Sequence, residues 1–168
     1  HEIHRAVEQL EEAGSKEIVL LHCVLEYPTQ PKNANLLSIP ALQQEFPGCS
    51  VGWSDHVKVA YDGASVIAAW LLGATIIEKH FTLDKTLAGN DHYHALDVAD
   101  VAALQEQLAY YSELLGSEGK TSLPCEAAAR TQARRSLVAR VGIPKGAVMT
   151  PEMLVPKRPG TGIPADCI

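Results

Sequence analysis

Two histidines occupy equivalent places in the sequence, each at the end of a short segment with strand character. His56 ends the segment 50–56, in which small or polar residues alternate with larger ones, and His80 lies near the end of segment 75–81. Alternate residues of a strand point to the same face, so Glu78 shares its face with His80. If the segments are neighbouring strands of one parallel sheet, both imidazoles meet at the same edge. Such a pair can ligate one divalent metal ion and leave positions open for water and substrate.

The surroundings of this pair leave several interpretations open. Glu78 would lie one layer below His80, where a carboxylate can act as an acid or base or orient a ligand. Alternatively, one histidine is a hydrogen-bonded polar residue of the fold and the other lies in a loop. Segment 89–94 could add ligands, but its composition favours a solvated loop. Tyr27, just after the first predicted strand, is either a substrate contact or a loop anchor.

Strand-like and helix-like segments alternate along residues 1–116. After a helix over 1–13, the pattern predicts βα units with strands at 18–23, 50–56 and 75–81 and helices at about 36–46, 64–72 and 97–115. This order is typical of a parallel sheet with crossover helices. No glycine-rich phosphate fingerprint follows any predicted strand, which makes a doubly wound dinucleotide fold less favoured. The clustering of polar residues where strands end favours a (β/α)8 barrel, because barrels carry their chemistry there.

The remaining sequence changes in composition. The composition of residues 117–133 predicts a linker. For residues 134–168 we expect a strand at 135–139, followed by a turn and a short helix that starts at Pro151. A segment of this size is small for an independent domain. We therefore expect residues 1–116 to be the last βα units of a barrel and 134–168 to be the first part of a second module.

Composition narrows the classes of function. Of 168 residues, 14 are Lys or Arg and 20 are Asp or Glu, giving a net charge of -6. This balance argues against nucleic-acid and anionic-membrane partners, which need a basic surface. The longest apolar run, Val66–Ile77, is too short to cross a bilayer. The 4 cysteines form no C-x-x-C pair, which favours free thiols and a cytoplasmic location over a zinc ribbon or a disulfide framework.

Several short motifs, taken in order, resemble the sialic acid (N-acetylneuraminate) synthase family, which includes legionaminic and pseudaminic acid synthases and spore-coat polysaccharide enzymes. The motifs are Leu21-His22-Cys23, Glu26-Tyr27-Pro28, Gly52 with Ser54-Asp55-His56, Gly73-Ala74-Thr75, Glu78-Lys79-His80-Phe81-Thr82-Leu83-Asp84, Asp91-His92 and Lys157-Arg158-Pro159-Gly160-Thr161-Gly162. The resemblance implies a TIM barrel followed by an antifreeze-like SAF domain, of which residues 134–168 would be the first part.

The resemblance also implies a reaction and a set of catalytic groups. The family condenses phosphoenolpyruvate with an N-acetylated hexosamine, such as N-acetylmannosamine, to a nine-carbon 2-keto sugar acid with release of phosphate. His56 and His80 match the family's divalent-metal ligands, usually for Mn2+, with Mg2+ as the alternative ion. Glu78 and Asp91 match acidic residues that act on the sugar and in proton transfer.

Substrate contacts and a partner subunit are implied in the same way. Tyr27 and Ser54 match substrate-binding positions, and Arg158 matches an arginine that the SAF domain delivers to the barrel of the partner, as in a domain-exchanged homodimer. The sequence departs from the family pattern at Leu25, where members often carry a polar residue, and at His94.

Other functions remain as alternatives to the synthase. One is a catalytically inactive carbohydrate-binding or scaffold fragment, although a full set of site residues weighs against the loss of catalysis. The other is a metal-dependent barrel hydrolase, which would need further ligands on other strands. Because three βα units cannot close an eight-stranded barrel, we expect the 168-residue chain alone to be inactive.

Overall fold

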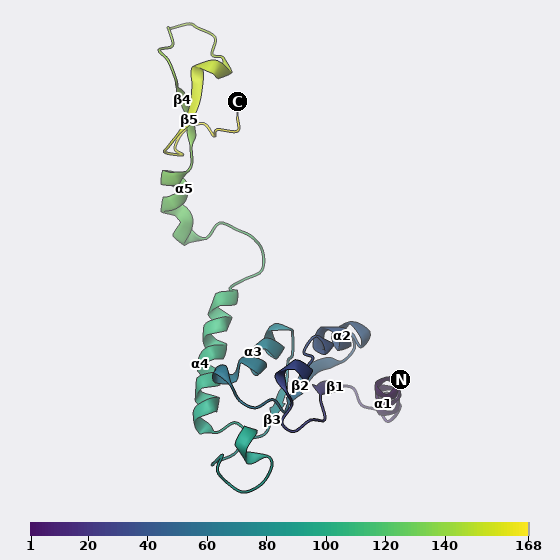
Figure 1. Ribbon diagram of the computed structural model, residues 1–168. Helices are drawn as coiled ribbons and strands as arrows, with labels where there is room; N and C mark the ends of the chain where they lie inside the picture. Colours follow the sequence, from purple (N-terminus) through teal and green to yellow (C-terminus); the bar gives the residue numbers. More distant parts are fainter. Residues whose placement is uncertain (168) are drawn as a thin grey trace. The chain divides into compact units, whose positions relative to one another are not determined.

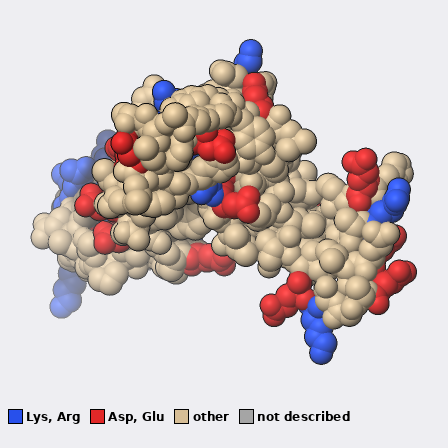
Figure 2. Space-filling view, turned by 90° about the horizontal axis from the view of Figure 1, so that it is seen from below, with Lys and Arg blue, Asp and Glu red and all other residues tan. Residues whose placement is uncertain are grey.

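The computed structural model describes residues 1–167 and divides the chain into two compact units, His1–Gly116 and Ser117–Ile168 (Figure 1). In the part of the chain that is described, no helix is both long enough and apolar enough to cross a membrane. Lys and Arg side chains occur in small groups among Asp and Glu on the face shown in Figure 2.

The first unit is an α/β fold with a parallel sheet in the order β1-β2-β3. Its elements are α1 (Glu2–Glu12), β1 (Val19–Cys23), α2 (Ser38–Glu45), β2 (Ser50–Asp55), α3 (Ala64–Leu71), β3 (Ile77–Lys79) and α4 (Val98–Leu115). The alternation of strands and helices confirms the predicted α/β class with a parallel sheet and crossover helices. β3 is shorter than the predicted strand, because the chain after His80 turns away and Phe81 forms only an isolated bridge to Leu96.

The two faces of β2 differ in the size of their side chains. Val51 and Trp53 are each 1% exposed, and they pack with Ile39 of α2 and Ala69 of α3 in one apolar cluster. The alternate residues Gly52 and Ser54 belong to the opposite face, because side chains alternate along a strand. The apolar face therefore anchors the helices, and the other face is left for small and polar groups.

Gly52 is required by the close approach of its neighbours. A Cβ at this position would collide with the backbone carbonyl oxygen of Ile76 and would lie 2.6 Å from Cδ2 of Leu21. The backbone N–H of Trp53 donates to the same carbonyl. This glycine therefore lets the strands that carry the two histidines pair closely.

Helix α4 begins and ends where its sequence predicts. The side chain of Asp97 accepts a hydrogen bond from the backbone N–H of Asp100, and the Asp100 side chain accepts one from the N–H of Asp97, which completes a capping box. Gly116 ends the helix with a φ of 60°. Leu104 of α4 packs against Val66 and Ile67 of α3, so the last helix covers the same side of the fold as α3.

The second unit contains an antiparallel pair of strands. Its elements are α5 (Ala127–Ala133), β4 (Ser136–Ala139) and β5 (Leu154–Lys157), with short 3-10 helices at Pro124–Glu126 and Pro151–Met153. The predicted linker 117–133 thus contains a helix, and β5 was not expected from the sequence. Ser136 Oγ donates to the carbonyl oxygen of Pro159 at 2.8 Å and accepts from the N–H of Gly162 at 2.8 Å, which holds the loop after β5.

Candidate metal and substrate site

The strand register brings His56 and His80 to equivalent positions. Ser54 on β2 is paired with Glu78 on β3, and each histidine follows two residues later. The centroids of the two imidazole rings are 5.1 Å apart, with the rings edge to face. Because a metal–nitrogen bond is about 2 Å long, rings at this separation are compatible with one shared ion. The structure therefore places the two predicted metal ligands side by side.

Glu78 is held by Ser54 across the strand pair. Ser54 Oγ donates to Glu78 Oε1 at 2.6 Å, and Ser54 is 6% exposed. A short hydrogen bond from a buried hydroxyl fixes the direction of the carboxylate. In this structure the Ser54 hydroxyl thus contacts the predicted acid/base residue, on the face that also carries the two histidines.

His56 is enclosed by an aromatic ring and a thiol. The Tyr27 ring lies 4.1 Å from the His56 ring, centroid to centroid, and Cys23 Sγ is 3.8 Å from His56 Nδ1. Burial lowers the pKa of His56, and the neighbouring His80 lowers it further. A neutral imidazole is the form that binds metals. His56 is therefore kept as a potential ligand at neutral pH.

A buried ion pair lies directly behind the two histidines. Lys79 Nζ is 2.8 Å from Asp55 Oδ2, and their side chains are 4% and 0% exposed. Lys79 also donates to the carbonyl oxygen of Val57 at 2.6 Å, and Asp55 Oδ1 accepts from the N–H of Val57 at 2.7 Å. Because Asp55 and Lys79 immediately precede His56 and His80 in the chain, this pair ties together the strand ends that carry the imidazoles.

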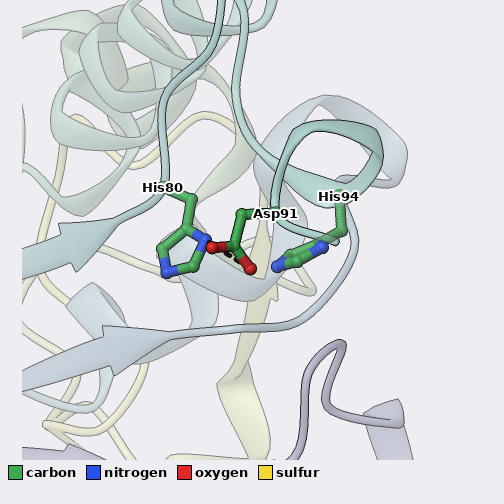
Figure 3. Close-up of side chains that lie close together, drawn as sticks. All are labelled: His80, Asp91 and His94. Atoms are coloured by element: carbon green, nitrogen blue, oxygen red, sulfur yellow. Dashed lines mark ion pairs between the residues drawn. The ribbon is translucent and has the colours of Figure 1, made fainter. Parts of the chain in front are cut away.

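The loop after β3 adds Asp91 and His94 to the site. One donor atom each from His80, Asp91 and His94 lie within 4.8 Å of one another. His80 Nδ1 is 3.7 Å from Asp91 Oδ1, and the His80 and His94 rings are 5.2 Å apart. Figure 3 shows the Asp91 carboxylate between the two imidazoles. Asp91, which was predicted as an acidic site residue, is therefore next to His80.

His94 corrects the expectation of a solvated loop. It is only 1% exposed, and its two ring nitrogens have no hydrogen-bond partner in residues 1–167. The cause is a long-range turn: the N–H of Leu96 donates to the carbonyl oxygen of His80 at 2.9 Å, and the N–H of Thr82 donates to the carbonyl of Leu96 at 2.8 Å. These bonds fold the loop back onto the end of β3. The sequence offered only one signal for this, a second histidine two positions after His92.

Burial lowers the pKa of His94, and the nearby His80 adds to the effect. The backbone of Asn90 and the Asp91 carboxylate oppose this effect by raising the pKa of His94. The Asn90 backbone is nevertheless not placed to form a regular hydrogen bond with the ring. His80 Nδ1 is likewise buried and has no hydrogen-bond partner in the described chain. Buried polar atoms are normally paired. Unpaired imidazole nitrogens beside a carboxylate are a donor set that fits a divalent cation.

The predicted site residues divide between the two units. Six of them, Tyr27, Ser54, His56, Glu78, His80 and Asp91, lie in the first unit, around the ends of its strands. Arg158 lies in the second unit, directly after β5, where its Nε donates to the carbonyl oxygen of Ala133 at 3.2 Å. The structure therefore assembles six of the predicted residues around one site.

Comparison with known proteins gives consistent results. The NeuB family model matches residues 1–120. The chain is 36% identical over 154 residues to N-acetylneuraminate-9-phosphate synthase of Homo sapiens, covering 91% of this chain and 42% of that protein. It is 36% identical over 166 residues to N,N'-diacetyllegionaminic acid synthase of Campylobacter jejuni, covering 98% and 48%. The chain thus spans about half the length of the curated relatives it matches.

A solved structure supports the same relationship. The crystal structure of an N-acetylneuraminic acid (sialic acid) synthetase from Leptospira borgpetersenii in complex with citrate matches with a TM-score of 0.65 and 32% identity. The match covers 76% of this chain and 43% of that chain. The fold of the chain and its sequence therefore lead to the same group of proteins.

Proposed function

Because the chain belongs to the NeuB family, we propose that the protein containing it condenses phosphoenolpyruvate with an N-acetylated hexosamine. The observation that carries this proposal is the pairing of His56 with His80 at adjacent strand ends, with Glu78 held beside them by Ser54. Relatives of the chain are named as synthases of N-acetylneuraminate 9-phosphate and of diacetyllegionaminic acid. The product would be a nine-carbon 2-keto sugar acid.

The atoms of the proposed reaction balance with water as the third reactant. The methylene carbon of phosphoenolpyruvate forms a bond to the aldehyde carbon of the open-chain sugar, water adds to the carbon that carries the phosphate ester, and phosphate leaves from that carbon. His56 and His80 would hold a divalent ion, which when bound would supply Lewis-acid polarisation of the aldehyde. We propose Mn2+ because the family resemblance implies it.

The other side chains have roles that follow from their positions. Glu78, oriented by the Ser54 hydroxyl, would move a proton at the reacting centre. Asp91 would bind the sugar or assist the same proton transfer from the loop side. The Tyr27 ring, packed on His56, would form one wall of the substrate site. These roles use the chain's own groups and require no further cofactor.

We further propose that the first unit is the end of a (β/α)8 barrel and that residues 134–168 begin a SAF domain. In this arrangement Arg158 would reach the barrel of the partner in a domain-exchanged homodimer, where its planar guanidinium would bind sugar oxygens. A cytoplasmic location is supported by the cysteines, which are all free in the described part of the chain.

The test is phosphate release by the intact protein that contains this chain. Phosphoenolpyruvate would be supplied with Mn2+ and, in separate reactions, N-acetylmannosamine, its 6-phosphate and a di-N-acetylated hexose. We expect one sugar to give phosphate and a 2-keto acid, and His80→Ala to abolish both. If no sugar supports phosphate release while the protein still binds these sugars, the carbohydrate-binding alternative replaces the proposal.

A further inference from the structure

We infer that His94 is a further protein ligand of the metal site, binding one divalent transition-metal ion together with His80 and Asp91. The inference rests on the proposed function in so far as it concerns the same ion. It adds a donor from the loop after β3 to the strand-end histidines. With this donor, the site would prefer ions that accept nitrogen ligands.

The His94 ring is buried without hydrogen bonds to any described residue. The ring is 1% exposed, and neither nitrogen has a partner in the described chain. His80 Nδ1 is buried without a hydrogen-bond partner as well, with the Asp91 carboxylate 3.7 Å away. A buried polar atom with no partner is unfavourable and therefore needs an explanation. A cation between the two rings would satisfy one nitrogen of each and would be balanced by the Asp91 carboxylate.

The donor atoms of the three residues lie close to ligating distance. Donor atoms that share an ion, each about 2 Å from it, lie about 3–4 Å apart. The donor atoms of His80, Asp91 and His94 lie within 4.8 Å of one another. A closure of about 1 Å would bring them to ligating distance, and Asp91 and His94 lie on one short loop segment that can make it together. His56 is not one of these three residues; its ring centroid lies 5.1 Å from that of His80.

The donor set determines which ions fit. Mg2+ prefers oxygen ligands and keeps its waters, whereas two imidazoles with one carboxylate suit transition-metal ions with open positions. His94 therefore shifts the preference of the site from Mg2+ toward Mn2+ and related ions. It also joins the loop 89–94 to the end of β3 through the ion.

The neighbouring His92 provides a matched control on the same loop. Its Nδ1 is 2.8 Å from Thr82 Oγ1, so its ring is held by a protein partner. His94→Phe keeps a ring of similar shape and removes both nitrogens, and His92→Phe makes the same change at the control position. Because the His94 ring makes no hydrogen bond within the described residues, His94→Phe should melt, without metal, at or above the temperature of the unmodified protein.

The experiment is a Mn2+ titration of the intact protein, with the signal of free Mn2+ followed by electron paramagnetic resonance. We expect His94→Phe to weaken Mn2+ binding at least about tenfold, with a smaller effect on Mg2+, and His92→Phe to change it by less than about threefold. His94→Cys should move the preference toward Zn2+, which thiolates favour. If His94→Phe does not fold, the ion preference of His94→Cys decides the question.

The outcomes separate this inference from the proposed reaction. Unchanged Mn2+ binding in His94→Phe, with binding lost in His80→Ala, overturns the role of His94 and leaves the synthase proposal intact. Weakened binding in His94→Phe, in a protein that releases no phosphate with any sugar, supports His94 as a ligand and refutes the reaction. Failure of the unmodified protein to bind Mn2+ overturns the inference.

Discussion

The ion pair between Asp55 and Lys79 offers the sharpest test of how the strand ends are held. Both side chains are almost completely buried, at 0% and 4% exposure, with 2.8 Å between Lys79 Nζ and Asp55 Oδ2. Lys79→Met would keep the apolar stem but leave the Asp55 carboxylate without its counter-ion. Removing one partner of a buried pair costs about 3–5 kcal/mol, because the remaining charge stays desolvated.

The hydrogen bonds around Asp55 and Lys79 change the expected loss of unfolding free energy. After the substitution Asp55 would still accept hydrogen bonds from the N–H of Val57 at 2.7 Å and from Ser65 Oγ at 3.1 Å. These donors reduce the loss, whereas the carbonyl of Val57, which now accepts from Lys79 at 2.6 Å, would lose a partner worth about 1 kcal/mol. We therefore expect Lys79→Met to lower the free energy of unfolding by about 3–4 kcal/mol.

The measurement is urea unfolding of the intact protein, followed by tryptophan fluorescence, since Trp53 is 1% exposed in the neighbouring strand β2. The matched control is the double variant Asp55→Asn with Lys79→Met, which removes the buried charge. It should recover about 2 kcal/mol of the loss, because no uncompensated carboxylate remains. A loss below about 1 kcal/mol in Lys79→Met, or a double variant as unstable as the single one, would refute the reasoning.

The remaining predictions concern pH, packing, the partner subunit and the isolated chain. Because the pKa values of His56 and His94 are lowered from 6.5, the unfolded chain binds more protons than the folded one below that pH; metal-free unfolding curves should show stability retained above about pH 6.5 and lost on acidification. Gly52→Ala places a Cβ against a backbone carbonyl, so we expect little soluble protein, and a normal melting temperature would contradict the close approach of the strands. Arg158→Lys should reduce turnover in steady-state assays, since an ammonium cannot replace a planar guanidinium; mixed dimers of Arg158→Ala and His80→Ala protomers should regain activity, and a lack of recovery in verified mixed dimers would reject an arginine acting in trans. The 168-residue chain alone should release no phosphate and should self-associate through its open sheet edges, which light scattering would detect; a compact monomer with cooperative unfolding would contradict the barrel proposal.

Local patterns were sufficient to predict the elements that carry the site. The alternation of small or polar residues with larger ones identified the strand before His56, and Asp97 identified the start of α4. Each histidine follows its strand at the same distance. Because the parallel strands pair in register, the two histidines lie close together in space. β5 was harder to predict, because Pro156 cannot donate to a ladder and argues against a strand except at an edge.

His94 shows why the rest of the site could not be predicted from the sequence. A histidine in a polar loop is expected to be solvated, and its burial here depends on hydrogen bonds from Leu96 to His80 and from Thr82 to Leu96. These bonds are long-range pairings that no local spacing specifies. The same turn that buries the imidazole also brings it within 5.2 Å of the His80 ring. Burial and proximity therefore have one cause, and a loop residue becomes a candidate ligand because the backbone folds back onto the strand end that carries His80.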